Sequence, residues 1–250
     1  MRIAISQSNY LPWRGYFGVI ASVDCFVFLD EVQFTSRDWR SRNRIKTKDG
    51  LKWLSIPVGS SISRRVSEVL LPKNNWHLGH KSLVKEAYKH SNNYERGLRF
   101  IEEIYLVEPF SHLSEYNKFC IQRISRDFFH LETKFLDSTQ IPHQGISSDR
   151  ILSIAKKIGA SEYITGPSGL NYLKISDFES SGIKVLVANF DSLPCYDQLH
   201  GEFVSNTSVI DLIFNVGEEL TPFIKIGETQ VSSSQSSPRL ITRKTRFMNS

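Results

Sequence analysis

The sequence predicts an α/β protein in which a Rossmann-like, mostly parallel sheet is combined with a β-hairpin and a helical insertion. Short apolar runs suited to buried strands alternate with stretches of helical spacing in both halves of the chain. Asp49-Gly50 stands between two alternating runs, which is a strong hairpin signal. Three successive stretches between about 76 and 130 have helical spacing with no strand between them. We expect a single domain over residues 1–226, with this insertion at about 76–130, and a disordered tail over 227–250.

The opening unit of the chain is the centre of the site hypothesis. It predicts a strand, a loop, a short helix and a second strand that ends at Asp30, over residues 2–6, 7–16, 15–22 and 26–29. The loop is rich in side chains that combine a flat face with a hydrogen-bonding group. Ligands of open α/β sheets bind at the carboxyl ends of the strands. We therefore expect Gln7, Tyr10, Trp13 and Asp30 to face one crevice.

The next segment carries a cluster of arginines around a tryptophan: Arg37, Trp39, Arg40, Arg42 and Arg44. Such a cluster is a cationic and stacking surface, suited to phosphates or to a nucleobase. A mobile, solvated loop explains the same composition. The hairpin over 45–58 would bring Asn43 and Arg44 back beside the first two strands.

Residues 66–71 have the pattern of a short edge strand, and the helical insertion follows at 76–89, 94–107 and 112–129. The first of these helices contains His77-Leu78-Gly79-His80, an HxGH tetrapeptide of the kind that holds ATP phosphates in nucleotidylyltransferases. There the motif directly follows the first strand, whereas no strand precedes it here. His77 and His80 also lack a third ligand nearby, so no metal site is predicted.

The second half returns to alternating elements, with strands at 134–136, 163–165 and 183–188 and a helix at 149–158. The turn over 166–172 follows a strand and precedes a helix, which would open its backbone N–H groups to an anion. The residues assigned to this anion site are Gly166, Pro167, Ser168, Gly169 and Tyr172. The spacing matches neither a Walker loop nor GxGxxG, and an N-cap formed by Ser168 is the alternative. Tyr196 and Gln198 follow the last strand, and 203–217 predict a short capped helix.

Composition and charge exclude some classes of protein. Most of the net charge of +5 comes from the C-terminal end, where five cations and one acid give +4: Lys225, Arg239, Arg243, Lys244 and Arg246 against Glu228. A phosphate-binding surface must therefore be argued from local clusters. Cys25, Cys120 and Cys195 are widely spaced and indicate free thiols of a reducing compartment. With no signal peptide and no run near 18 apolar residues, we expect a cytoplasmic protein without a membrane span.

Six blocks of the sequence together resemble the WbqC-like protein family. They are QSNYLPWRGYF at 7–17, FLDEVQ at 28–33, RNRI at 42–45, GPSGLNYL at 166–173, PCYDQ at 194–198 and FVSNTSVIDLIFNVG at 203–217. The resemblance covers roughly residues 1–220. Ser8 and Asn9 stand where the family usually has a proline after the glutamine, and Leu193 stands where a histidine is usual. The second departure counts against a mechanism that needs a base at that position.

The resemblance implies a transferase of bacterial surface-polysaccharide (O-antigen) biosynthesis, which attaches an aminoacyl or other acyl group to the amine of a nucleotide-linked amino sugar. In this interpretation Asp30 is the base or orients the amine, and Gln7, Asn43 and Arg44 hold carbonyl or phosphate oxygens. The residues assigned to the substrate are Tyr10, Trp13, Tyr16, Gln33, Arg40, the 166–172 turn, Tyr196 and Gln198. The alternatives are that Asp30 caps a turn or pairs with Arg40 or Arg44, and that Trp13 and Tyr16 pack in the core.

No cofactor is assigned, but such a reaction requires an acyl donor, which is an aminoacyl-tRNA, an acyl-CoA, or an amino acid plus ATP. No Cys or Ser stands in a recognisable arrangement with a His and an acid, which disfavours a covalent acyl-enzyme. One alternative is an ATP-dependent nucleotidylyl- or adenylate-forming enzyme of the same pathway, assisted by the arginines at 37–44. Another is a non-catalytic module that binds a nucleotide sugar or RNA. With an aminoacyl-tRNA as donor, the arginine segment and the tail could contact the tRNA.

Overall fold

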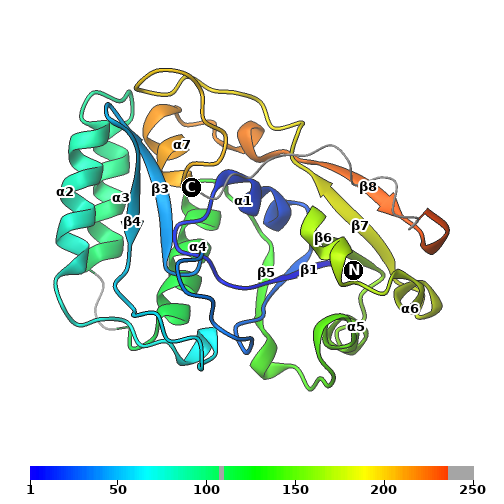
Figure 1. Ribbon diagram of the computed structural model, residues 1–250. Coiled ribbons are helices and arrows are strands. Elements are labelled where there is room, and N and C mark those ends of the chain that lie inside the picture. Colours follow the sequence, from blue (N-terminus) through cyan, green and yellow to red (C-terminus); the bar gives the residue numbers. More distant parts are fainter. Residues whose placement is uncertain (107–109, 236–250) are drawn as a thin grey trace.

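The computed structural model describes residues 1–106 and 110–235, which form a six-stranded sheet and a separate two-stranded hairpin (Figure 1). The sheet has the order β5-β2-β1-β6-β7-β8. Its strands are β1 (Arg2–Ser6), β2 (Cys25–Phe28), β5 (Lys134–Asp137), β6 (Glu162–Thr165), β7 (Lys184–Asn189) and β8 (Gly227–Val231). β8 is antiparallel to β7, and the other neighbouring strands are parallel. The mostly parallel sheet predicted from the sequence is confirmed.

Helices cover both faces of the sheet because successive side chains of a strand point to opposite faces. Ile3 and Ile5 of β1 belong to one hydrophobic cluster, and Ala4 belongs to the other. The helices outside the insertion are α1 (Arg14–Ala21), α5 (Ser147–Lys157), α6 (Ile175–Ser180) and α7 (Val209–Asn215). α1 and α7 pack on the side of Ala4, and α5 and α6 pack on the side of Ile3 and Ile5.

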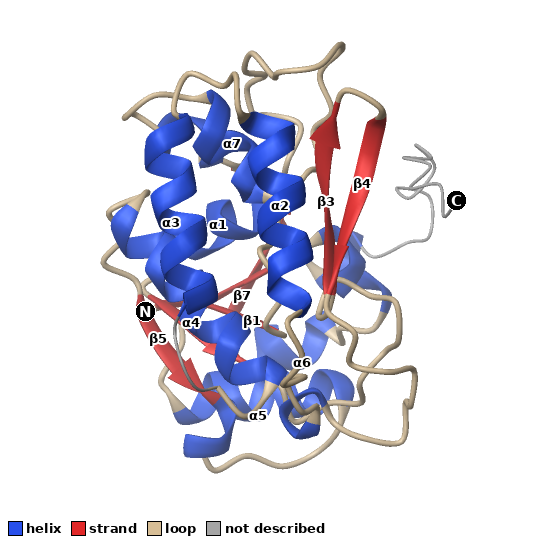
Figure 2. Ribbon diagram, turned by 90° about the vertical axis from the view of Figure 1, so that its left-hand side faces the viewer, coloured by secondary structure: helices blue, strands red, loops and turns tan. Residues whose placement is uncertain are grey.

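The predicted helical segment forms three helices, α2 (Trp76–Tyr88), α3 (Tyr94–Leu106) and α4 (Leu113–Asp127). The predicted hairpin is formed by β3 (Arg42–Thr47) and β4 (Gly50–Ser55), and it stands beside α2 (Figure 2). Ile45 and Leu54 have no exposed surface and join the core that the helices share with the sheet. The hairpin thus packs one face into the core, whereas Leu51 and Trp53 on its other face are exposed.

Two predicted elements are wrong. Residues 66–71 form a 3₁₀ helix at Val66–Glu68 instead of an edge strand, because the Val66 and Ser67 amides donate to carbonyls of the segment after β2. The tail predicted to be disordered from 227 begins with β8, which pairs with β7 from Val185↔Val231 to Asn189↔Gly227. Its sequence GETQV has almost no apolar residues, so backbone pairing at the sheet edge supplies what the hydrophobic pattern does not show. Residues 236–250 of that tail lie outside the described residues.

The order of the strands defines a switch point between β1 and β6. From β1 the chain crosses to β2 through α1 on one face of the sheet, whereas β5 connects to β6 through α5 on the other face. Ligand crevices of open α/β sheets lie at the carboxyl ends of strands beside such a point. Within the described part of the chain, no helix has the length and apolar character needed to cross a membrane.

Candidate functional site

The structure brings three of the predicted site segments to the same edge of the sheet. Ser6 at the end of β1 pairs with Phe28 of β2, and Ala4 pairs with Ile164 of β6. Gln7, Asp30 and the turn that begins at Gly166 therefore follow three adjacent strands at their carboxyl ends. This is the edge predicted to hold the crevice.

Asp30 is buried at this edge, with 1% of its surface exposed. Its Oδ1 accepts a hydrogen bond of 2.8 Å from the Ser8 amide, and its Oδ2 accepts one from the Ser114 hydroxyl. The Nζ of Lys118 on α4 lies 3.6 Å from Oδ2, so the cation beside Asp30 is Lys118 and neither Arg40 nor Arg44. These contacts fit a residue that orients Lys118 and the opening loop. A role for Asp30 as a base stays a prediction.

Lys118 links Asp30 to a second carboxylate, Asp137 at the end of β5. The side chains of Lys118 and Asp137 are 18% and 25% exposed, so this ion pair reaches the surface. Burial favours a higher pKa of Asp137, but hydrogen bonds from Lys118 and Thr139 outweigh it and lower the pKa. Neither Lys118 nor Asp137 is among the site residues predicted from the sequence. Asp137 directly follows the strand predicted at 134–136, as Asp30 follows the one predicted at 26–29, and this repeated pattern was the available signal.

A second pair of acid–base groups lies at the ends of the same two strands. The Glu31 carboxylate accepts a hydrogen bond of 2.6 Å from the Ser138 hydroxyl, and the Nε2 of His143 lies 3.8 Å from the same oxygen. His143 Nδ1 lies 2.7 Å from the Ile141 carbonyl, which can only accept, so Nδ1 carries a proton and Nε2 is directed to Glu31. The side chains of Glu31 and His143 are both partly exposed. Nothing in the local sequence marked His143 as a candidate.

Gln7 of the opening loop, Tyr16 of α1 and Arg40 before β3 form one connected group. The Gln7 side-chain oxygen accepts a hydrogen bond from Arg40, and the Tyr16 hydroxyl donates to the Gln7 carbonyl over 2.8 Å. Trp13 packs instead against Phe190, with ring centroids 4.9 Å apart. A Cβ on Gly15 would lie 2.4 Å from the Trp13 ring, so this ring position requires glycine there. Trp13 is half-buried in these contacts, and its stacking on a ligand stays a prediction.

Three other predicted residues have partners away from this edge. Tyr10 has no exposed surface, and its hydroxyl hydrogen-bonds to Tyr105 over 2.6 Å and to His80 over 2.9 Å. Asn43 is also buried and donates over 2.7 Å to the Leu11 carbonyl, which fixes the opening loop to β3. Gln33 is exposed and donates to the Ile62 carbonyl. The structure does not bring these three side chains to the predicted crevice.

The HxGH tetrapeptide lies on α2 and does not present its second histidine to a phosphate. His80 accepts a hydrogen bond from Tyr10 at Nδ1, and its Nε2 lies 3.1 Å from the Ser55 carbonyl, to which it donates. Burial lowers the pKa of His80 to about 4, with a smaller opposing effect from Ser55. This histidine is therefore neutral and structural at physiological pH.

The buried neutral His80 predicts a loss of stability in acid. The unfolded chain binds a proton at this histidine below pH 6.5, whereas the folded chain does so only near pH 4. The stabilisation is fully present above pH 6.5 and should fall by about 3 kcal/mol as the pH decreases to 4. Urea unfolding at pH 7 and pH 4.5 measures this. His80→Gln should weaken the pH dependence and His90→Gln, at an exposed position, should not; equal slopes in both variants would refute the assignment.

The turn after β6 forms a 3₁₀ helix over Pro167–Asn171. Its N-cap is Gly166, so the alternative in which Ser168 is the N-cap is wrong. The amides of Gly169 and Tyr172 donate to carbonyls within the turn, which leaves fewer N–H groups for an anion than the sequence suggested. A Cβ on Gly169 would lie 2.0 Å from the Thr165 hydroxyl, so the turn is packed tightly on the end of β6. Pyrophosphate binding at this turn stays a prediction.

Tyr196 and Gln198 hold the loop after β7 through a buried carboxylate on α7. The Asp211 Oδ1 accepts hydrogen bonds from the Tyr196 hydroxyl (2.8 Å) and from the Gln198 amide (2.7 Å), and Oδ2 accepts one from Tyr88 (2.9 Å). Burial raises the pKa of Asp211, and these hydrogen bonds oppose the shift. Gln198 also accepts a hydrogen bond of 3.1 Å from the buried Lys46 amine of β3. Asp211 is not among the site residues predicted from the sequence, although it lies in the last of the six family-like blocks.

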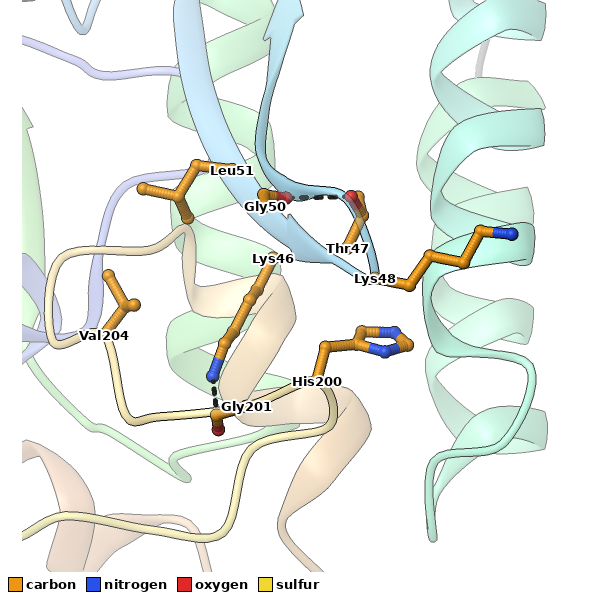
Figure 3. Close-up of a pocket in the computed structure, with 8 residues that line it drawn as sticks. All are labelled: Lys46, Thr47, Lys48, Gly50, Leu51, His200, Gly201 and Val204. Atoms are coloured by element: carbon orange, nitrogen blue, oxygen red, sulfur yellow. Dashed lines mark hydrogen bonds between the residues drawn. The ribbon is translucent and has the colours of Figure 1, made fainter.

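Two surface hollows lie outside the predicted crevice. One, of about 410 Å³, is formed by the end of the hairpin and the loop around Gly201, where the Lys46 amine donates to the Gly201 carbonyl (Figure 3). The other, of about 470 Å³, lies at the amino ends of β1 and β6 around Arg2 and Glu162. Neither is lined by a predicted site residue. Within residues 1–106 and 110–235, no three His, Cys, Asp or Glu side chains are grouped to hold a metal ion.

Comparison with known proteins agrees with the sequence blocks that surround this site. The sequence model of the WbqC-like protein family matches residues 7–222. The chain is 33% identical over 226 residues to the uncharacterized protein Rv1507c of Mycobacterium tuberculosis, which covers 90% of this chain and 97% of that protein. No solved structure matches the chain. The family match spans the opening loop, the hairpin, the helical insertion and α7, and the chain belongs to the WbqC-like protein family.

Proposed function

We propose that this protein is a transferase that attaches an aminoacyl or other acyl group to the amine of a nucleotide-linked amino sugar, in the synthesis of a bacterial surface polysaccharide. The sugar and the pathway come from the family resemblance of the sequence blocks. The observation that supports group transfer is the arrangement of Lys118 between Asp30 and Asp137, beside the Glu31–His143 pair. These groups supply a cation and a base at the edge of the sheet where such folds bind ligands.

In the proposed reaction, His143 Nε2 removes a proton from the sugar ammonium, and Glu31 stabilises the imidazolium that forms. The freed amine nitrogen attacks the carbonyl carbon of the acyl donor, and the negative charge that develops on the carbonyl oxygen faces the Lys118 ammonium. The bond from that carbon to the oxygen or sulfur of the donor then breaks. The leaving group takes up the proton from His143, and the nitrogen releases its second proton to solvent water, which leaves a neutral amide and restores the resting state.

Buried Asp30 has a positioning role in this scheme. A carboxylate with almost no exposed surface is costly to keep ionised without partners, and here its partners include the cation proposed to face the substrate. In this scheme Asp30 therefore holds the Lys118 amine at the carboxyl end of the sheet. Gln7 and Arg40, joined by a hydrogen bond at the adjacent strand end, would contact the sugar or its phosphates.

Mass spectrometry of nucleotide-linked amino sugars incubated with the protein tests the proposal. Each sugar is offered an acyl-CoA, an amino acid with ATP, or a charged tRNA, and one donor should give a product with the mass of an amide. We expect Lys118→Met and His143→Gln to lower the rate by about 100-fold or more, since general base and oxyanion contributions are of this size. Lys89→Met, which removes an exposed lysine at the C-cap of α2, is the matched control.

The variants also separate loss of chemistry from loss of folding. Circular dichroism should show folded protein for Lys118→Met and His143→Gln at the assay temperature. No mass gain with any donor, or full activity in both variants, would refute the proposed reaction.

A further inference from the structure

The outer face of the hairpin carries a compact group of aromatic and cationic side chains. It consists of Trp39 from the turn before β3, Arg42 and Arg44 of β3, and Trp53 of β4, and we call it the Trp–Arg platform. Arg44 and Trp53 are directly paired across the two strands, so their side chains share one face. Arg42 is two residues before Arg44 and lies on the same face. Trp53 gave no signal in the sequence, because its contact with the arginines arises only from the register of the hairpin.

The side chains of the platform stack on one another. The Arg42 guanidinium lies 4.0 Å from the centre of the Trp53 ring, and Arg44 lies 5.3 Å from the same ring and 5.9 Å from Trp39. The two tryptophan rings are 5.8 Å apart at an angle of 39°. Stacking on indole holds each guanidinium flat and reduces the entropy that it loses on binding a ligand.

The platform is exposed and its charge is not neutralised by the protein. Trp39 and Trp53 are 40% and 39% exposed, which is unusual for the largest apolar side chains. In the described part of the chain, neither Arg42 nor Arg44 forms an ion pair, and the Nε of each lacks a hydrogen-bond partner. Burial, together with the neighbouring charge of Arg42, lowers the pKa of Arg44. An anion placed on this face would relieve that repulsion.

The hollow at the end of the hairpin extends this face. Lys46 and Leu51 are paired two positions beyond Arg44 and Trp53, on the same face of the hairpin, and both line the hollow of about 410 Å³ (Figure 3). The Lys46 amine donates hydrogen bonds to the Gln198 side-chain oxygen and to the Gly201 and Glu202 carbonyls, so it shapes the hollow without offering a free charge. A volume of this size is within the range of small-ligand sites.

We propose that the Trp–Arg platform is a nucleotide-binding surface, on which the tryptophans and the Arg42 guanidinium stack with a base and the two arginines contact its phosphates. Exposed indole rings bind the flat ring of a base, and guanidinium groups without an ion-pair partner bind phosphate. A nucleotide carries both groups side by side. A simple anion would not use the tryptophans, and an apolar ligand would not use the arginines. The nucleotide is the one attached to the amino sugar, or it belongs to the 3′ end of an RNA that carries the acyl group.

This inference deepens the proposed function, because the identity of the nucleotide rests on the substrate proposed there. The platform is connected to the edge of the sheet through Arg40, whose side chain bonds Gln7 and whose carbonyl accepts a hydrogen bond of 2.8 Å from Asn117 on α4. A ligand that extends from the platform along this turn would reach the strand ends. Binding of the nucleotide itself does not require the transfer reaction.

Isothermal titration of the whole protein with uridine diphosphate, adenosine diphosphate, inorganic pyrophosphate and a single-stranded RNA hexamer tests the proposal. We expect nucleotides to bind more tightly than pyrophosphate. Trp53→Leu should weaken nucleotide binding by about 10- to 100-fold, as expected for the loss of one stacked base, while Trp53→Tyr should retain most of it. Arg42→Gln should weaken binding by about 10-fold and reduce its salt dependence.

Lys52→Gln is the matched control, because Lys52 is exposed on β4 next to Trp53 but its side chain belongs to the opposite face of the hairpin, with Leu54. It removes the same charge as Arg42→Gln and should leave binding unchanged. Tighter binding of the hexamer with a steep salt dependence would assign the platform to RNA, and equal or tighter binding of the diphosphates would assign it to the nucleotide sugar. Equal affinity for pyrophosphate and nucleotides, or no binding at millimolar concentration, would overturn the proposal. The transferase proposal would survive that result, since its readout is product mass.

Discussion

Replacing Asp211 with alanine is expected to lower the free energy of unfolding by about 3–5 kcal/mol. Three donors now reach this fully buried carboxylate, from Tyr88, Tyr196 and Gln198, and each buried donor left without an acceptor costs about 1–3 kcal/mol. The loop after β7 would also lose its attachment to α7. Urea unfolding followed by tryptophan fluorescence measures the change.

Two variants control this measurement. Asp211→Asn keeps an oxygen for Tyr196 and Gln198 and should cost about 1–2 kcal/mol, because only the charge and one acceptor are lost. Asp197→Ala, at an exposed position of the same loop, should change the stability by less than about 0.5 kcal/mol. Equal losses in Asp211→Ala and Asp197→Ala would show that the network does not stabilise the fold.

Removal of Asp30 is expected to have the second large effect. Asp30→Ala should cost about 3 kcal/mol, since it leaves the Ser8 amide and the Ser114 hydroxyl without their acceptor and removes one of the two carboxylates beside Lys118. A double-mutant cycle with Lys118→Met measures the coupling, which we expect to be about 1–2 kcal/mol because Lys118 is partly exposed. The transfer rates of the wild type, the two single variants and the double variant report whether Asp30 acts through Lys118.

The exposed Lys89–Glu86 pair on α2 provides the reference for this cycle. Its side chains are 45% and 61% exposed, and its coupling should be close to zero because solvent screens an exposed ion pair. If the Asp30–Lys118 coupling is no larger than this reference, Asp30 does not hold Lys118 in place. If Asp30→Ala keeps full activity while its stability falls, Asp30 has only a structural role.

The fold could be predicted where the hydrophobic periodicity and the turn residues of a single segment are enough to specify its secondary structure. The apolar runs of β1, β2 and β7, the helical spacing of α2 to α4, and the Asp49-Gly50 turn all specify elements that the structure contains. β8 could not be found in this way, because GETQV is stabilised by pairing with β7 and not by an apolar face. The prediction of a strand at 66–71 is wrong for a related reason. The Val66 and Ser67 amides donate to carbonyls of the segment after β2 and are not available to a neighbouring strand.

The candidate site was predictable only in part. Asp30 was found because a carboxylate directly follows an apolar strand, but its partner Lys118 lies in the helical insertion and no spacing connects the two. Tyr10 and Asn43 were assigned to a ligand because a polar aromatic and an amide are common in sites, yet the same groups serve equally well to hold a buried loop. Which of these roles applies depends on tertiary contacts that sequence patterns do not contain.

The pairing of β1 with β6 has a consequence for the synthesis of this protein. Arg2 is paired with Glu162, so β1 waits during synthesis for about 160 further residues before one of its edges is covered. At 5–20 residues per second this interval is roughly 10–30 s, during which a flat apolar strand edge is open to other chains. We therefore expect the yield of the native protein to depend on chaperones that shield nascent chains, and to fall when translation of the helical insertion is slowed.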